Sequence, residues 1–257
     1  AILDDFCGHI ERIADKICME SRMEESLEFI DLRTVEERLH GKNSIAHEFV
    51  DKRRGWCRSR FIPVDYDEDG RLLHVIYCIE SIDEEKKREN RLLYLAQTDL
   101  MTGLCNRGSG ERRINELLQE RTGGLLCLLD CDKFKAVNDT YGHSVGDKVI
   151  IAVAESLQKS CRENDVLMRL GGDEFAIFMP GLLEQKSAEK FFDRLFENVG
   201  EIAIEEMQGK HVEISLGACF YDGSEFVSFD QLYRNADHAM YQSKKKQGYS
   251  ATIYDGQ

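Results

Sequence analysis

Residues 125–129 form an uninterrupted apolar run, Leu-Leu-Cys-Leu-Leu, that follows Gly123-Gly124 and ends at Asp130. A half-buried strand alternates apolar with polar residues, so a continuous run indicates a strand covered on both faces. The segments around it alternate in type. We expect helices near 107–121, 133–140, 145–161, 184–198 and 228–246, and strands near 124–130, 165–169, 175–179, 211–220 and 251–254. This part of the chain is therefore predicted to be an α/β sandwich with a central mixed sheet.

The region before it has a different pattern, with three strands expected at 44–50, 55–64 and 71–80. The run Asp67-Glu68-Asp69-Gly70 fits a hairpin turn with Gly where positive φ is needed. Side chains in the middle strand alternate as in a half-buried antiparallel strand. A smaller α+β unit is therefore expected to precede the sandwich.

Two further helices are expected before residue 98. The stripe Ile2, Phe6, Ile10, Ile13 and Ile17 predicts an amphipathic helix that either faces a core or forms a dimer. Residues 82–97 are first charged and then apolar, without a breaker. They predict a linker helix whose apolar positions are Ile82, Leu92, Leu93 and Leu95.

Charge and cysteine usage exclude several classes of protein. The net charge of −14 argues against general nucleic-acid binding and against docking on anionic membranes. The apolar runs are too short for a membrane span, and no signal peptide is expected. The nine Cys contain no Cys-x-x-Cys pair, so we expect reduced thiols in a cytoplasmic protein. The chain begins at Ala1 rather than Met, as a fragment would.

Carboxylates follow two predicted strand ends. Asp130-Cys131-Asp132 ends the apolar strand, and Gly171-Gly172-Asp173-Glu174 forms the turn between two later strands. Strand ends are where α/β proteins place ligands, and oxygen ligands of this kind suit Mg²⁺. Two such ions can activate a hydroxyl and stabilise a leaving pyrophosphate. Asp132 is alternatively the N-cap of the next helix.

With Phe175, this turn reads Gly-Gly-Asp-Glu-Phe and resembles the signature of the GGDEF family of diguanylate cyclases. Three more segments resemble family motifs in order and spacing: the opening motif at 99–107, the substrate motif at 130–147 and the last helix at 236–241. The resemblance runs from about Thr98 to about Tyr254 and makes a chance match very improbable. It implies the GGDEF (nucleotidyl-cyclase/palm-like) fold.

The resemblance implies that the chain condenses two GTP into cyclic di-GMP and releases pyrophosphate, with two Mg²⁺ per active site and Mn²⁺ as an alternative. Asp130, Asp173 and the carbonyl of Cys131 would hold the metal. Asp173 or Glu174 would act as the base, and Lys135 would stabilise charge in the transition state. The implied substrate-binding residues are Lys133, Phe134, Lys135, Asn138, His143, Asp147, Gly171, Gly172 and Lys244.

Among these positions, Asp147 is expected to set the specificity for guanine, and His143 has two possible roles. A carboxylate at Asp147 accepts from N1–H and N2–H₂ of guanine, which adenine does not offer. His143 either supports the nucleoside pocket or is a structural turn residue. One departure from the family also stands out. The family usually has Lys-x-x-Gly-Arg after the lysine of the last helix, whereas this chain continues Lys245-Lys246-Gln247-Gly248-Tyr249. Lys lacks the bidentate fork of Arg, so weaker GTP binding is expected even if Lys245 or Lys246 compensates.

The resemblance also implies regulation. A two-fold symmetric product requires two facing domains, hence a homodimer. Arg162 and Asp165 have the spacing of the family's R-x-x-D product-inhibition site, with Arg194 as a candidate third residue. Residues 44–80 and the acidic exit at 80–86 resemble the C-terminal half of a PAS sensor domain, in a truncated form without an expected ligand pocket.

The predicted organisation is therefore a helical and PAS-like sensory region at 1–81, a signalling helix at 82–97 and a GGDEF domain at 98–257. The competing hypothesis is a catalytically silent GGDEF domain that binds cyclic di-GMP or GTP. Because Asp130, Asp173 and Glu174 are all present, the sequence favours the enzyme.

Overall fold

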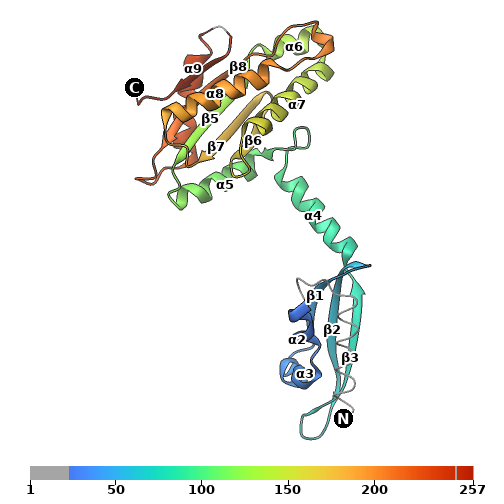
Figure 1. The fold of residues 1–257 in the computed structure, drawn as a ribbon. Helices are drawn as coiled ribbons and strands as arrows, with labels where there is room; N and C mark the ends of the chain where they lie inside the picture. The colour runs from blue at the N-terminus through green and yellow to red at the C-terminus, as the bar shows by residue number, and fades with distance from the viewer. Residues whose placement is uncertain (1–22, 247, 257) are drawn as a thin grey trace. The chain divides into compact units, whose positions relative to one another are not determined.

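The computed structural model describes residues 23–246 and 248–256, and its contacts divide the chain into two compact units, Ala1–Leu92 and Leu93–Gln257 (Figure 1). The helix predicted at 2–17 lies outside the described residues.

The first unit is a three-stranded antiparallel sheet with two helices packed on it. The strands are β1 (Ile45–Asp51), β2 (Gly55–Tyr66) and β3 (Leu72–Ser81), in the order β1-β2-β3. The helices α2 (Met23–Ile30) and α3 (Leu32–Leu39) are additional to the predicted elements, and they bury Phe29 and Leu39 against Phe61 of the sheet. The three predicted strands are confirmed as β1, β2 and β3. The predicted turn is confirmed because Gly70 has a positive φ of 79°.

The linker helix α4 (Asp83–Gln97) begins one residue later than predicted, because Ile82 precedes it and is buried rather than lying on the helix. Its start is fixed to the sheet of the first unit. Asp83 Oδ1 accepts from the Trp56 amide at 3.2 Å, and Lys86 Nζ lies 2.9 Å from Glu48 Oε2. No helix in the described ranges is both long and apolar enough to cross a membrane.

The second unit is built on a six-stranded mixed sheet in the order β4-β6-β7-β5-β8-β9. The pairs at the two edges are parallel and the inner pairs are antiparallel, which confirms the predicted mixed sheet. The strands are β4 (Cys105–Asn106), β5 (Gly124–Cys131), β6 (Val166–Gly171), β7 (Glu174–Pro180), β8 (Ile214–Tyr221) and β9 (Ser250–Ile253).

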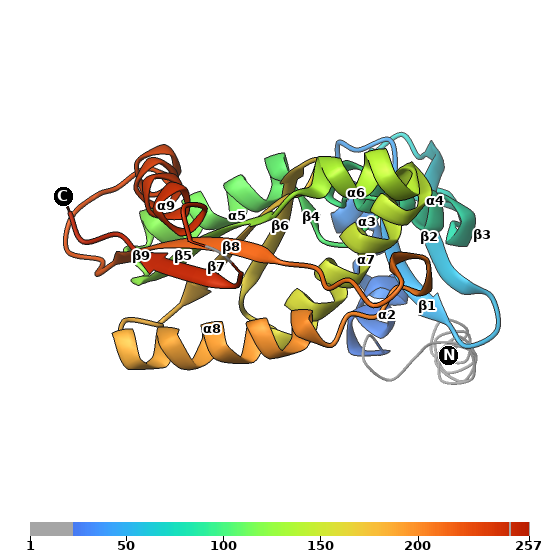
Figure 2. The same cartoon turned by 90° about the horizontal axis from the view of Figure 1, so that it is seen from above.

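Helices cover both faces of this sheet (Figure 2). α5 (Arg107–Gln119) and α9 (Phe229–Ser243) pack on one face, and α7 (His143–Ser160) and α8 (Gln185–Gly200) pack on the other. Alternate residues of β5 enter the two cores, Leu128 facing α5 and α9 and Leu129 facing α7 and α8. The apolar run 125–129 is therefore buried on both faces, as predicted. The short helix α6 (Phe134–Tyr141) follows β5, and a 3₁₀ turn, η2 (Glu205–Met207), precedes β8.

Candidate active site

The end of β5 and the turn between β6 and β7 come together at one end of the sheet. Asp130 lies opposite Glu174 of β7 in the antiparallel register, and the Cys131 amide donates to the Asp173 carbonyl at 3.3 Å. The turn itself uses glycines at φ values of 147° for Gly171 and 56° for Gly172, conformations that L side chains rarely adopt. No other atom lies within 4 Å of where a Cβ would stand on either glycine, so the tip of the turn is open to a ligand.

Acidic groups outnumber basic groups at this strand end. Burial, and then the charge of Asp130, raise the pKa of both Asp173 and Glu174 above the usual range. Lys244, at the end of α9, places Nζ 2.7 Å from Asp130 Oδ2. Burial would lower the pKa of Lys244, but the hydrogen bond to Asp130 and the surrounding negative charge raise it. One lysine therefore faces three carboxylates.

This donor set fits a hard cation that is also bound by phosphate. No three His, Cys, Asp or Glu side chains within the described ranges gather closely enough to enclose a metal alone. Mg²⁺ typically takes one or two carboxylates and completes its shell with water and substrate phosphates. The raised pKa of Asp173 next to Asp130 is the electrostatic situation that a bound cation would relieve. The residues present thus fit Mg²⁺ held jointly with a nucleotide.

Arg169 of β6 bonds to the glycine turn and holds it in place. The sequence did not identify it as a site residue. Its guanidinium donates to the Gly172 carbonyl at 2.7 Å and to both carboxylate oxygens of Asp99 at 3.2 Å. Asp99 also accepts from the amide and hydroxyl of Thr102. The opening motif 99–107 is therefore tied directly to the turn that carries Asp173.

The N-terminus of α6 is not capped by Asp132, the residue that the sequence offered for that role. The Asp132 carboxylate accepts from the buried Ser215 hydroxyl at 2.8 and 3.0 Å. Lys133 is the N-cap residue, with a left-handed φ of 58° and no side-chain cap bond. The first amides of a helix have no intrahelical partner, so those of Phe134 and Lys135 can receive an anion. The Lys133 ammonium is exposed and lies 3.7 Å from Glu213.

The predicted guanine-reading residues lie on the neighbouring helices α6 and α7. The Asn138 side chain covers Gly146, because a Cβ built there would stand 1.9 Å from Asn138 Oδ1. This close approach places Asn138 beside the segment that carries Asp147. Asp147, His143 and Lys135 are all exposed. The structure thus brings Asn138 and Asp147 to one region, while their roles stay predictions.

The residues around the end of α9 have other contacts where the family usually has an arginine. Lys245 lies over the Tyr241 ring at 4.4 Å, and Lys246 Nζ is 3.3 Å from Thr252 Oγ1. The Tyr249 hydroxyl donates to the Val212 carbonyl at 2.8 Å, and its ring packs against Phe196. Among the residues described after α9, Lys244 alone is paired with a predicted metal-binding carboxylate.

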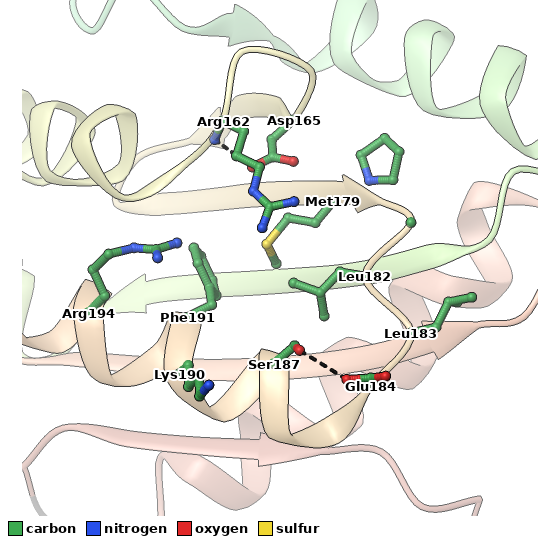
Figure 3. A pocket seen from close by; sticks show the side chains of 12 residues that line it. Arg162, Asp165, Met179, Leu182, Leu183, Glu184, Ser187, Lys190, Phe191 and Arg194 are labelled. Carbon is green, nitrogen blue, oxygen red and sulfur yellow. Dashed lines mark hydrogen bonds between the residues drawn. The ribbon is translucent and has the colours of Figure 1, made fainter.

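A pocket of about 540 Å³, separate from the glycine turn, contains the predicted inhibition residues (Figure 3). Arg162 and Asp165 come from the turn after α7, and the Arg162 amide donates to Asp165 Oδ2 at 2.7 Å. The side chain of Arg194 enters the same pocket from α8 and donates to the Ser160 carbonyl. The structure therefore brings together all three residues.

Comparisons with known proteins agree with this geometry. The sequence pattern described as "Diguanylate cyclase, GGDEF domain" matches residues 96–250. Diguanylate cyclase DgcM of Escherichia coli K12 is 29% identical over 212 residues, covering 80% of this chain and 49% of that protein. Cyclic di-GMP phosphodiesterase PdeB of Shewanella oneidensis is 26% identical over 188 residues, covering 72% of this chain and 21% of that protein. The chain therefore spans about half, or less, of the curated relatives it matches.

Among solved structures, one neighbour is the coiled coil and GGDEF domain of DgcB from Caulobacter crescentus in complex with c-di-GMP. It is 25% identical with a TM-score of 0.59, and the match covers 67% of this chain and 93% of that one.

Proposed function

Because the chain belongs to the GGDEF family of diguanylate cyclases, we propose that it condenses two GTP into cyclic di-GMP and releases pyrophosphate. The observation that carries this proposal is the convergence of Asp130, Asp173 and Glu174, with Lys244, at the open glycine turn. A silent member of the family would be expected to have lost one of these acids.

In the proposed reaction, the 3′-oxygen of one GTP attacks the α-phosphorus of the other. A new O–P bond forms, the bond to pyrophosphate breaks, and the hydroxyl proton passes to a carboxylate. Asp173 and Glu174 are the candidates for this base, because Glu174 lies opposite Asp130 in the sheet and Asp173 precedes it in the same glycine turn. Repeating the step with the roles of the two nucleotides exchanged closes the ring.

Asp130, Asp173 and the Cys131 carbonyl would hold Mg²⁺, with two ions per site and Mn²⁺ as an alternative. When bound, the metal supplies Lewis-acid stabilisation of the phosphates and the attacking oxygen. Lys135 and the amides at the start of α6 would receive the outer phosphates, together with Lys133 and Lys244. Asn138 and Asp147 would read the guanine edge, and exposed His143 would border this pocket.

We also propose that the active form is a homodimer, because each domain contributes one GTP to a two-fold symmetric product. The linker helix offers Leu92, Leu93 and Leu95, all exposed, to a second copy. In this proposal residues 1–81 are a PAS-like sensory region, 82–97 the signalling helix and 98–257 the cyclase domain. Replacing the three leucines by Gln should abolish activity while GTP binding persists, and unchanged activity would contradict this role.

The pocket that contains Arg162, Asp165 and Arg194 is proposed to bind cyclic di-GMP and inhibit the enzyme. Arg can donate to guanine O6 and N7, and Asp accepts from N1 and N2. Arg162→Ala should raise the product concentration needed for half inhibition without changing the initial rate.

A second candidate function is a silent domain that binds cyclic di-GMP or GTP. The absence of an Arg after Lys244 and the structural use of Tyr249 favour it. Incubating the protein with GTP and Mg²⁺ and separating the products distinguishes the two. Cyclic di-GMP formed by the wild type and not by Asp173→Asn supports the enzyme, whereas tight cyclic di-GMP binding without synthesis supports the silent domain.

A further inference from the structure

Ser243, the last residue of α9, is fully buried and directly precedes Lys244. Its hydroxyl donates to the Leu216 carbonyl of β8 at 2.8 Å and shares a 2.8 Å hydrogen bond with Thr252 Oγ1 of β9. Its own carbonyl accepts from the Ser250 hydroxyl at 2.9 Å. One small side chain therefore joins the end of α9 to two strands.

The rest of α9 approaches the same strand unusually closely. A Cβ on Gly217 of β8 would stand 2.1 Å from the Ala236 carbonyl oxygen and from the Met240 amide nitrogen. The helix axis is thus set by backbone contact at Gly217, and its C-terminal end is set by Ser243. Lys244 follows immediately, with Nζ at 2.7 Å from Asp130.

We propose that Ser243 is a positioning residue that acts through Lys244, holding the lysine so that its ammonium reaches the phosphate site beside Asp130. The Ser243 hydroxyl occupies a buried position where an apolar side chain would also pack. Its bonds to β8 and β9 keep the last turn of α9 from fraying, which an apolar side chain could not do. Without these bonds, the last turn of α9 can unwind and Lys244 samples positions away from the nucleotide. This inference rests on the proposed function, since it assumes that a nucleotide binds there.

The test measures binding of 3′-deoxy-GTP with Mg²⁺ to the full chain by calorimetry. This analogue lacks the attacking hydroxyl, so binding is measured even if the wild type makes no cyclic di-GMP. Lys244→Gln should weaken binding on the order of 30-fold, the loss of one charge-assisted hydrogen bond to phosphate. Ser243→Ala should weaken it about fivefold, and Thr252→Val, which removes the partner from the other side, should weaken it in the same direction.

Ser156→Ala is the matched control for loss of a buried serine. Ser156 is also buried, and its hydroxyl donates to the Ala152 carbonyl within α7. Both serine variants should lose similar thermal stability, but only Ser243→Ala should weaken nucleotide binding. In the Lys244→Gln background, Ser243→Ala should have no further effect on binding. Equal weakening in the two backgrounds, or equal weakening by Ser156→Ala, would overturn the proposal.

If 3′-deoxy-GTP does not bind the wild type, the proposed nucleotide site and this inference both fail. If it binds and no cyclic di-GMP forms, the proposed synthesis fails while the positioning role of Ser243 is still tested by the variants.

Discussion

Replacing Asp99 by Asn should lower the melting temperature of the second unit by about 4–8 °C at pH 7. Arg169 bridges Asp99 and the Gly172 carbonyl, and its side chain is 13% exposed against 25% for Asp99. Asn keeps an oxygen for Thr102 but removes the charge that faces Arg169. Hydrogen bonds to charged groups contribute about 1.5–3 kcal/mol, and partial exposure reduces this to about 2 kcal/mol. A unit of this size loses about 2–4 °C per kcal/mol.

The pair of Asp99 and Arg169 also predicts that the stabilisation contributed by Asp99 depends on pH. Burial alone would raise the pKa of Asp99, but the hydrogen bonds from Thr102 and the Arg169 charge outweigh it and hold the pKa below the usual range. A carboxylate with a depressed pKa stabilises the fold above its unfolded pKa, and that stability is lost as the pH falls through the folded value. The difference between wild type and Asp99→Asn should therefore be full at pH 7 and shrink below about pH 4.

Scanning calorimetry of the full chain at several pH values measures the difference in melting temperature between wild type and Asp99→Asn. In a double-mutant cycle, the effects of Arg169→Gln and Asp99→Asn should sum to more than the effect of the double variant, because both lose the same ion pair, while Arg169→Gln also loses the bond to the Gly172 carbonyl. A melting-temperature change under about 1 °C at pH 7 contradicts the predicted 2 kcal/mol contribution. A difference that persists unchanged at pH 3.5 contradicts the charge-based explanation.

Three further outcomes follow from the geometry. Gly217→Ala should cost about 3 kcal/mol in thermal unfolding because its Cβ meets the backbone of α9. The control Gly108→Ala, whose added Cβ would stand 3.8 Å from the Asn106 side chain, should cost nothing, and equal costs would contradict the close approach. Asp147→Asn should reduce the preference for GTP over ATP in a competition assay by about tenfold, the loss of one charge-assisted contact to guanine, and an unchanged preference would remove Asp147 from guanine recognition. Burial and the charge of Asp165 raise the pKa of Cys161 to about 12, so this protonated thiol should react with iodoacetamide more slowly than exposed Cys78, and equal rates by site-resolved mass spectrometry would contradict that burial.

The regular elements of the second unit follow from local pattern. The apolar run 125–129 predicts a doubly covered strand, and β5 is buried on both faces. The paired glycines predict the turn that carries Asp173. Predicted element ends differ from the structure by a few residues, as at β8, which begins at Ile214 rather than near 211.

The contacts between distant segments were not predictable in the same way. Arg169 meets Asp99 across 70 positions, and Ser215 meets Asp132 across 83. Sequence pattern identifies a polar residue within a strand but not its partner, so it offers the helix N-cap as one alternative for Asp132 and does not point to Ser215. A serine inside an otherwise apolar strand, as at Ser215 in β8, is the signal that such a partner exists.

The most direct test of the account is product analysis of the purified full chain incubated with GTP and Mg²⁺, alongside Asp173→Asn. We expect cyclic di-GMP and pyrophosphate from the wild type and neither from the variant, with both proteins showing the same fold by circular dichroism. Absence of cyclic di-GMP from a folded wild type that binds 3′-deoxy-GTP, or equal synthesis by Asp173→Asn, would contradict it.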